Sequence, residues 1–344
     1  MPENPSPLEP FITRLPKVEL HVHLEGSVRP QTLRELAQAK GRHGQGVEEW
    51  ITRRAQSGFR YRNFREFIDA FTAVTLLLET PADYALVTTR LVEWLAEQNV
   101  RYAEVTLSAG VVLWKKQSLE AVFEAVAAAA RERGGRLGVR VNWIFDAIRQ
   151  FGAEHARKVL EYAGRFRHQG VVAFGIGGDE ARGPADLFPD IFREARDLGL
   201  HVTAHAGETY GPESVRQAVE LLGAERIGHG LAAARDPAVM ALLRERGVPL
   251  EVCLSSNVAT GALARFEDHP LPKFLEEGLV VTLSTDDPAM FGTSLVREFE
   301  LAAANFSLAR EQLLRLCENA ARAAFLPEEK KRPLLEELER AAPG

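Results

Sequence analysis

Two histidines separated by one residue, His21 and His23, are the first side chains of the sequence that could act together chemically. They end an apolar stretch, Lys17–Leu24, with the composition of a β-strand. Alternate side chains of a strand point the same way, so the two imidazoles share one face, with their Cα atoms roughly 6 to 7 Å apart. Such a pair can bind a metal ion, although lone histidine pairs are also common hydrogen-bonding groups.

Three further polar segments follow other apolar stretches. One carries His205 and, three residues later, Glu208, and the next carries His229 between two glycines. The third carries the adjacent carboxylates Asp286 and Asp287. Each has an ordinary structural explanation when taken alone, since histidines occur in turns and paired acids often cap helices. Together they supply the imidazole and carboxylate ligands that zinc accepts.

We therefore predict a site for one zinc ion per chain. Its predicted ligands are His21, His23, His205 and Asp286. A catalytic zinc keeps a position for water and can lower the pKa of that water to about 7. His229 would orient the water or take its proton, and Glu208 would donate a proton to a substrate ring nitrogen. Asp287 would accept a hydrogen bond from the substrate. The spacing by itself indicates metal-assisted hydrolysis and does not identify the electrophile.

These residues need a scaffold that brings the ends of several strands together. Eight short stretches rich in Val, Ile and Leu alternate with helix-like stretches such as Leu119–Arg133, as in repeated βα units. The predicted strands are Lys17–Leu24, Arg101–Leu107, Gly138–Phe145, Val171–Ile176, His201–Ala206, Arg226–His229, Leu250–Leu254 and Val280–Ser284. Eight units predict a (β/α)8 TIM barrel, whose active site lies at the carboxyl ends of the strands.

The stretch between the first two predicted strands, from Pro30 to Gln98, is too long for one helix and predicts several extra helices. Within it, Phe64, Phe67 and Phe71 recur at helical spacing. We predict that Phe64 and Phe67 contact the substrate from a helix over the barrel mouth. Ordinary packing of these aromatic rings into a core is the alternative.

Composition is that of a folded globular protein, with 46% hydrophobic and 26% charged residues among 344. The net charge of −6 argues against polymeric nucleic acid as a partner. Two cysteines are too few for a disulfide framework, and no stretch resembles a signal peptide or membrane span. We expect a cytoplasmic protein with a flexible arm, residues 1–14, and one catalytic domain, residues 15–344. The sequence leaves the oligomeric state open.

Taken together, these segments resemble the adenosine deaminase family of the metal-dependent amidohydrolase superfamily. The resemblance extends from about Leu15 to Phe325. It rests on five motifs in this order: Pro16–Gly26, Gly177–Glu180, His205–Glu208, Arg226–Gly230 and Ser284–Pro288. It implies a (β/α)8 barrel that uses zinc to hydrolyse the 6-amino group of adenosine or deoxyadenosine, releasing ammonia and the inosine product.

The resemblance also implies roles for individual residues. Glu208 would protonate N1 of the purine, and His229 would direct water onto C6. Asp287 would bind N7, and Gly178 would donate its backbone N–H to N3. Adenine-specific relatives look as though they carry aspartate where this chain has Gly228, which favours a nucleoside over the free base.

One position departs from the family pattern. Where typical members carry aspartate for the ribose 5′-hydroxyl, this chain has Glu25. Glu25 is predicted to face the sugar and to bind either a hydroxyl or a modified 5′ end. The segment Cys253–Asn257 resembles a bacterial branch that includes deaminases of 6-aminodeoxyfutalosine, a menaquinone precursor. That substrate is the alternative to adenosine. Three further alternatives rank below it: an adenine deaminase, an amidohydrolase with a different reaction, and a barrel that binds a nucleoside without catalysis.

Overall fold

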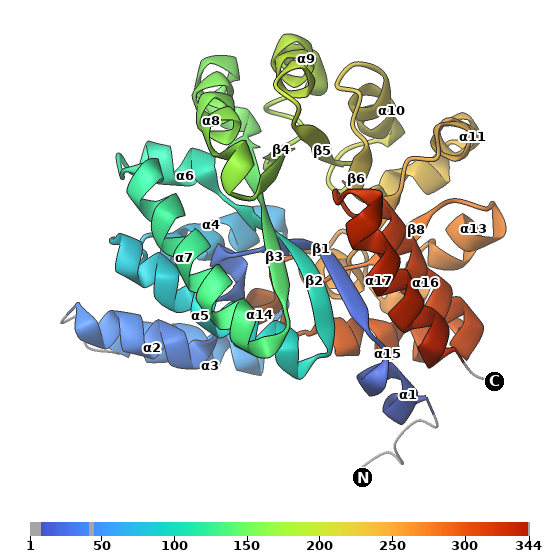
Figure 1. Ribbon diagram of the computed structural model, residues 1–344, viewed down its shortest axis with the longest axis horizontal. Helices are drawn as coiled ribbons and strands as arrows, with labels where there is room; N and C mark the ends of the chain where they lie inside the picture. The colour runs from blue at the N-terminus through green and yellow to red at the C-terminus, as the bar shows by residue number, and fades with distance from the viewer. Residues whose placement is uncertain (1–7, 41–44, 343–344) are drawn as a thin grey trace.

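The computed structural model describes residues 8–40 and 45–342 and shows a nearly closed barrel of eight parallel strands (Figure 1). The strands neighbour one another in chain order. They are β1 Lys17–His23, β2 Val100–Leu107, β3 Arg140–Ile148, β4 Val171–Gly177, β5 His201–Ala206, β6 Arg226–His229, β7 Leu250–Val252 and β8 Val281–Leu283. A parallel bridge between Val22 and Asp286 connects the end of β8 to β1. The predicted TIM barrel is confirmed.

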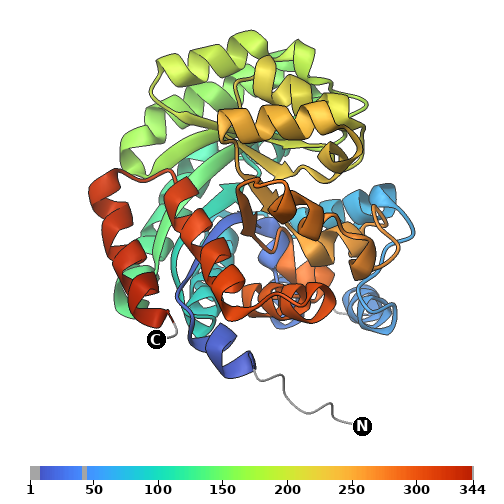
Figure 2. The same ribbon diagram turned by 90° about the vertical axis from the view of Figure 1, so that its right-hand side faces the viewer.

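Helices follow most strands and surround the barrel (Figure 1). The α-helices are α1 Glu9–Arg14, α2 Pro30–Ala39, α3 Gln45–Gln56, α4 Phe64–Thr75, α5 Pro81–Glu97, α6 Ala109–Trp114, α7 Leu119–Leu137, α8 Ala153–Phe166, α9 Pro189–Asp197, α10 Pro212–Glu220, α11 Pro237–Arg246, α12 Leu254–Ala259, α13 Leu271–Glu276, α14 Pro288–Phe291, α15 Leu295–Phe306, α16 Arg310–Ala323 and α17 Glu328–Ala341. The extra helices predicted between the first two strands are α2 to α5. Figure 2 shows the C-terminal helices, in red, on the other side of the barrel from the light-blue helices of this insertion.

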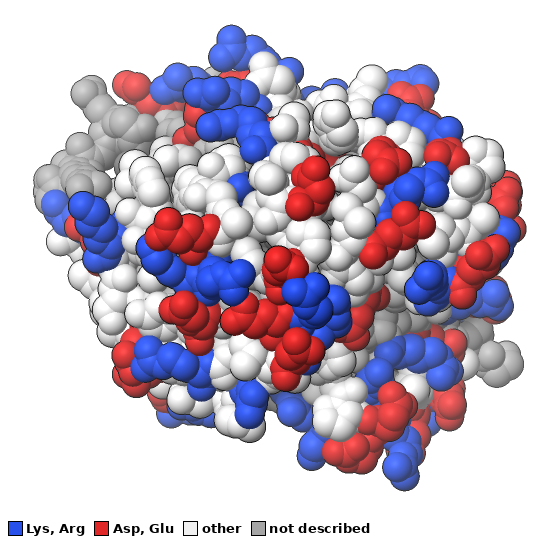
Figure 3. All heavy atoms as spheres, turned by 90° about the horizontal axis from the view of Figure 1, so that it is seen from above, with Lys and Arg blue, Asp and Glu red and all other residues white. Residues whose placement is uncertain are grey.

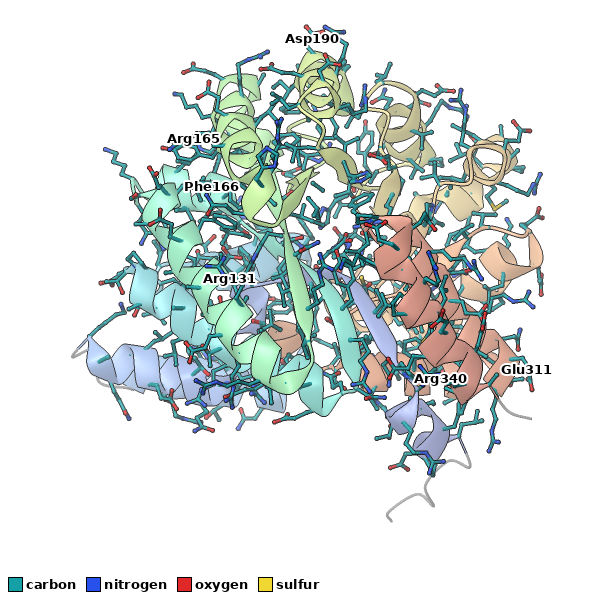
Figure 4. The ribbon with its side chains drawn as sticks, in the orientation of Figure 1. Arg131, Arg165, Phe166, Asp190, Glu311 and Arg340 are labelled. Carbon is teal, nitrogen blue, oxygen red and sulfur yellow. The ribbon has the colours of Figure 1, made fainter. Side chains whose placement is uncertain are left out.

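The core lies between the strands and the surrounding helices. Phe145 of β3 packs against Phe123 of α7 and Phe166 of α8, with ring centroids 5.1 and 6.3 Å away. On α8, Phe166 is buried whereas its neighbour Arg165 is exposed on the outer side (Figure 4). This amphipathic pattern lets each helix bury one face on the sheet, which leaves the inner faces of the strands free to carry polar residues.

Two strand boundaries differ from the sequence prediction in ways that affect the site. β3 begins at Arg140, because Gly138 ends α7 in a left-handed conformation with φ of 73°. It continues to Ile148, three residues beyond the predicted end, and so includes Asp146. β7 ends at Val252, since α12 starts at Leu254. Apolar composition alone could not separate the end of this strand from the start of the helix.

The first half of the predicted flexible arm, up to residue 7, lies outside the described residues. From Glu9 to Arg14 the chain instead forms α1, in which Ile12 is buried. The buried Lys17 ammonium donates hydrogen bonds to the carbonyls of Ile12, over 2.5 Å, and Leu15, over 2.8 Å. The prediction of a flexible arm is wrong for this helix, because its apolar side packs on the core and the lysine fixes the chain that follows.

Positive and negative side chains are intermixed over the face seen in Figure 3. This distribution gives no single-sign surface there of the kind that polymeric nucleic acid binding uses. Among the described helices, none has both the length and the apolarity needed to cross a membrane.

Candidate active site

A cavity of about 120 Å³ lies at the carboxyl ends of the strands. The predicted site residues that line it are His23, Phe64, Phe67, Gly178, His205, Glu208, His229, Asp286 and Asp287. They come from segments spread over more than 220 residues of sequence, and the barrel fold brings them together around one cavity. The remaining two, His21 and Glu25, are not part of the cavity lining and are buried behind it.

Four of the lining and adjacent side chains converge on one point. Nε2 of His23 lies 3.2 Å from Nε2 of His205 and 3.3 Å from Oδ1 of Asp286. Nε2 of His21 lies 3.5 Å from the same carboxylate oxygen. A tetrahedral zinc with bonds of about 2.0 to 2.2 Å separates its ligand atoms by about 3.3 to 3.6 Å. These three separations are close to those values, so the four predicted ligands are compatible with a zinc ion.

The wider cluster offers ligand atoms within 4.8 Å of one another in two overlapping groups: His21, His205, His229 and Asp286, and His23, Asp286 and Asp287. Within the described part of the chain, Nε2 of His21 is buried without a hydrogen-bond partner. Burial lowers the pKa of His23 to about 4 and that of His205 well below its usual range. Neutral imidazole is the form that binds metals.

His21 behaves differently from the other two imidazoles. Burial lowers its pKa, but hydrogen bonds and charges from Asp286 and Glu251 outweigh burial and raise the pKa well above its usual range. The negative field that favours a proton on this imidazole also favours a metal cation in its place. The electrostatics of the cluster therefore agree with its geometry.

Neighbouring groups fix the direction in which each candidate ligand points. Nδ1 of His21 lies 2.9 Å from Oε2 of Glu251, and Nδ1 of His205 lies 3.2 Å from the carbonyl oxygen of Ile176. With a proton on each Nδ1, each Nε2 keeps its lone pair for a metal. The hydroxyl of Ser256 donates to Oδ2 of Asp286 over 2.7 Å, which leaves Oδ1 toward the imidazoles.

The backbone around the cluster is adapted to close approach. A Cβ atom at Gly228 would lie 2.6 Å from Cε1 of His21, so only glycine leaves room for that ring. The glycine before His229 thus leaves space for a proposed metal ligand. His229 and Asp286 both have φ of 63°, a conformation rare outside glycine. Strain of this kind is often found at functional sites.

A chain of hydrogen bonds sets the tautomer of His229. The backbone N–H of Leu271 donates to Nδ1 of His269 over 3.0 Å, so Nε2 of that ring carries the proton. That nitrogen donates to Oδ1 of Asn257, and the Asn257 amide then donates to Nδ1 of His229, each over 3.3 Å. Neutral His229 therefore holds its proton on Nε2. A protonated nitrogen cannot bind a metal, so His229 presents an N–H donor toward the cluster.

Glu208 occupies the loop after β5, and Glu180 holds that loop in place. One Glu180 carboxylate accepts backbone hydrogen bonds from Gly207, over 2.7 Å, Glu208, over 2.9 Å, and Thr209, over 2.8 Å. Burial, with the charges of Asp286 and Glu180, raises the pKa of Glu208 well above its usual range. Its Oε2 lies 3.6 Å from Nε2 of His229. A carboxyl group in this environment can donate a proton.

Asp287, the second of the two adjacent carboxyl residues, also lines the cavity. Oδ1 of Asp287 is buried without a hydrogen-bond partner among the described residues. Burial, followed by the adjacent Asp286 charge, raises the pKa of Asp287 well above its usual range. The sequence predicted that this carboxyl accepts a hydrogen bond from the substrate; the raised pKa favours its protonated form, which donates one.

The predicted covering helix is α4, whose aromatic residues both line the cavity and pack in an apolar cluster; their contact with a substrate stays a prediction. Phe64, Phe67 and Phe71 line the cavity. Phe67 is also 6% exposed and packs 5.5 Å from Tyr61 and 5.1 Å from Phe291, between ring centroids. These residues form a small apolar cluster separate from the main core.

Glu25 departs from its predicted position at the substrate. The short 3-10 helix Glu25–Ser27 turns its carboxylate away from the cavity, and Oε1 accepts the backbone N–H of Ser108 over 3.1 Å. Glu25 is fully buried. Glu25 therefore accepts a hydrogen bond from a residue of the cavity wall and is not itself part of the lining.

Sequence reasoning missed several residues of the site. Asn257 and His269 set the His229 tautomer, Glu251 orients His21, and Glu180 anchors the Glu208 loop. Glu180 and Asn257 belong to quoted motifs and could have been singled out. Glu251 and His269 stand in no recognisable motif, and Asp146, which also lines the cavity, lies beyond the predicted end of its strand.

Comparison with known proteins places the site in a family context. Residues 16–341 match the family model described as adenosine deaminase. An aminodeoxyfutalosine deaminase from Streptomyces coelicolor is 37% identical over 98% of this chain and 87% of its own length. An adenosine deaminase from Shigella flexneri is 36% identical over 95% of this chain and 98% of its own length. The crystal structure of a Burkholderia ambifaria amidohydrolase with bound Zn superposes with a TM-score of 0.88 at 25% identity, covering 98% of this chain and 94% of that one.

Proposed function

The chain belongs to the adenosine deaminase family, and from that premise we propose that it is a zinc-dependent hydrolase that removes the 6-amino group of a purine nucleoside. The observation that carries the proposal is the convergence of three imidazoles and one carboxylate beside Glu208 and His229. This arrangement combines a metal site, a proton donor and a water-orienting N–H within one cavity.

The proposed zinc ligands are His21, His23, His205 and Asp286. Three of the distances among them, from His23 to His205 and from Asp286 to His21 and to His23, suit a tetrahedral ion. The bound zinc in a structural neighbour supports the choice of metal. When bound, zinc would act as a Lewis acid that makes water nucleophilic near neutral pH.

The remaining residues would perform the proton transfers and hold the ring. The Nε2–H of His229 would hydrogen-bond the attacking water and direct it toward C6. Glu208 would give a proton to N1, so that C6 becomes more electrophilic. Asp287 would donate to N7, and the backbone N–H of Gly178 would donate to N3. The Glu208 carboxylate left by the transfer to N1 would take the proton released by the attacking water and pass it to the 6-amino group. The C6–N6 bond would then break, ammonia would leave, and the hydroxyl proton would return to Glu208 as the C6 carbonyl of the product forms.

Two nucleosides compete as the substrate. Adenosine or deoxyadenosine follows from the motifs shared with the family. An adenosine modified at its 5′ end, such as 6-aminodeoxyfutalosine, is favoured by the similarity to the Streptomyces deaminase and by the position of Glu25. Phe151 lines the cavity and stacks on the half-exposed Trp114, with centroids 6.1 Å apart. Apolar surface therefore continues outward from the cavity, where a bulky 5′ substituent would find contacts, and we rank the 5′-modified substrate first.

A substrate panel that varies only the 5′ substituent tests the proposal. Zinc-loaded protein would be given adenosine, deoxyadenosine, 5′-deoxyadenosine and 6-aminodeoxyfutalosine, and the loss of the 6-amino chromophore would be followed together with ammonia release. We expect turnover, with the highest kcat/KM for 6-aminodeoxyfutalosine. A preference for adenosine would reverse the ranking, and no turnover of any nucleoside would overturn the proposed function.

A further inference from the structure

Asp146 is a buried carboxyl group in the cavity wall that the roles described above do not use. It lies on the inner face of β3, is 3% exposed and lines the cavity together with Gly177, Gly178 and Ser108. It belongs to neither group of candidate metal ligands among the described residues.

Among residues 8–40 and 45–342, no hydrogen bond to the Asp146 carboxyl oxygens is found, and only burial and the charges of Arg149, His21 and Glu25 shift its pKa. The nearby cation does not satisfy it. Arg149 donates instead to the carbonyl of Gly183, over 3.0 Å, and to that of His205. A carboxyl left without a partner in a buried site is costly unless a ligand supplies one.

The neighbouring strand is shaped to receive this side chain. A Cβ atom at Gly175 would lie 3.1 Å from Oδ1 of Asp146, and one at Gly177 would lie 2.9 Å from Oδ2. Glycines at these two inward positions of β4 leave the space that the carboxyl occupies. The position of Asp146 is therefore built into two adjacent strands.

The place of Asp146 relative to the purine indicates what it meets. If the backbone N–H of Gly178 holds N3, the sugar lies beside it, because N3 and the sugar-bearing N9 are bonded to the same carbon, C4. Asp146 lies beside Gly177, which precedes Gly178 in the cavity wall. Glu25 accepts a hydrogen bond from Ser108 and is not part of the cavity lining.

We propose that Asp146, rather than Glu25, is the residue that recognises the sugar of the nucleoside, by a hydrogen bond to one of its hydroxyl groups. This inference rests on the proposed function and adds a specificity-determining residue to it. Loss of a hydrogen bond that leaves a buried polar group unpaired is enough to change kcat/KM about ten-fold or more.

The test combines substitutions in the protein with removal of single hydroxyl groups from the substrate. The wild-type protein, Asp146→Ala and Asp146→Asn would each be assayed with adenosine, 2′-deoxyadenosine, 3′-deoxyadenosine and 5′-deoxyadenosine. We expect Asp146→Ala to lower kcat/KM for adenosine about ten-fold or more and to leave one monodeoxy analogue within about three-fold. That analogue identifies the hydroxyl. Asp146→Asn, which keeps an acceptor, should lose less.

Glu25→Gln is the matched control, since it changes the other buried carboxylate and should retain the wild-type ratio between adenosine and each analogue. Zinc content and thermal unfolding of each variant would separate sugar recognition from damage to the fold. An equal loss of activity on all four nucleosides in Asp146→Ala, or a ratio that changes only in Glu25→Gln, would overturn this inference alone. A wild-type protein inactive on all four and also on 6-aminodeoxyfutalosine would overturn it together with nucleoside deamination.

Discussion

Charged side chains are buried both in the network of Arg226, Glu104 and Glu251, here called the floor of the barrel, and at the barrel mouth, where the candidate active site lies. The two regions differ in how these charges find partners. On the floor, Arg226 donates to Glu104 over 2.6 Å and to Glu251 over 2.5 Å, and its guanidinium lies 3.7 Å above the ring of Phe325. Glu104 also accepts hydrogen bonds from the hydroxyl of Tyr102 and the backbone N–H of Phe325. Every charge of this network has partners from the protein.

At the mouth, by contrast, several polar atoms lack a partner within the described residues. These atoms are Nε2 of His21, Nε2 of His229 and Oδ1 of Asp287. The pKa values show the same difference: burial and the nearby acids raise the pKa of Glu208, whereas Arg226 and His21 outweigh burial and lower the pKa of Glu251. The floor thus stabilises the folded chain, and the mouth keeps unsatisfied groups for a metal and a substrate.

The largest expected effect is at the mouth. Replacing Glu208 with glutamine removes the proposed proton donor while keeping its size, and we expect kcat to fall about 100- to 10,000-fold. The melting temperature should stay the same or rise, because a buried acid without a full set of partners has been removed. Steady-state kinetics and thermal unfolding would measure both. Glu213→Gln, on the exposed side of α10, is the control and should behave like wild type. A variant that loses stability but keeps its rate would contradict the proposed role.

The second prediction concerns the contribution of Arg226 on the floor to the free energy of unfolding. Arg226→Met leaves the buried carboxylates of Glu104 and Glu251 without their shared cation, and we expect a loss of about 3 to 5 kcal/mol in the free energy of unfolding. Urea unfolding of metal-free protein isolates this effect from metal binding. The exposed pair Arg265 and Asp268 provides the control, since Arg265→Met should leave the free energy of unfolding close to that of the wild type. Equal effects of the two substitutions would remove the distinction between floor and surface.

The third prediction tests the one residue that connects the two regions. Glu251 binds Arg226 on the floor and Nδ1 of His21 at the mouth. Glu251→Gln weakens the support of a proposed zinc ligand, and we expect zinc affinity to fall about 10- to 100-fold. Competition with a chelator would measure it. Glu104→Gln disturbs the same network without touching His21 and should lose stability with little change in zinc affinity. Similar losses of affinity in both variants would show that the floor acts on the metal site only through general stability.

The sequence by itself determined the barrel and most of the chemical groups at its mouth. Strand composition and the alternation with helices identify eight units, and chemistry-bearing residues that follow strands must meet at one end of a parallel barrel. That reasoning placed His23, His205, Glu208 and Asp286 correctly at the cavity, because it requires only the side-chain type and the strand end.

Tertiary structure alone decided how those groups are directed. The proton on Nε2 of His229 depends on Asn257 and His269, and the orientation of His21 depends on Glu251, 230 residues away in sequence. Glu25 lies two residues after a proposed ligand yet turns to Ser108, while Asp146 enters the cavity because two glycines on the next strand leave room for it. Such contacts follow from strand register and from side chains on neighbouring strands, which the local sequence of a strand does not contain.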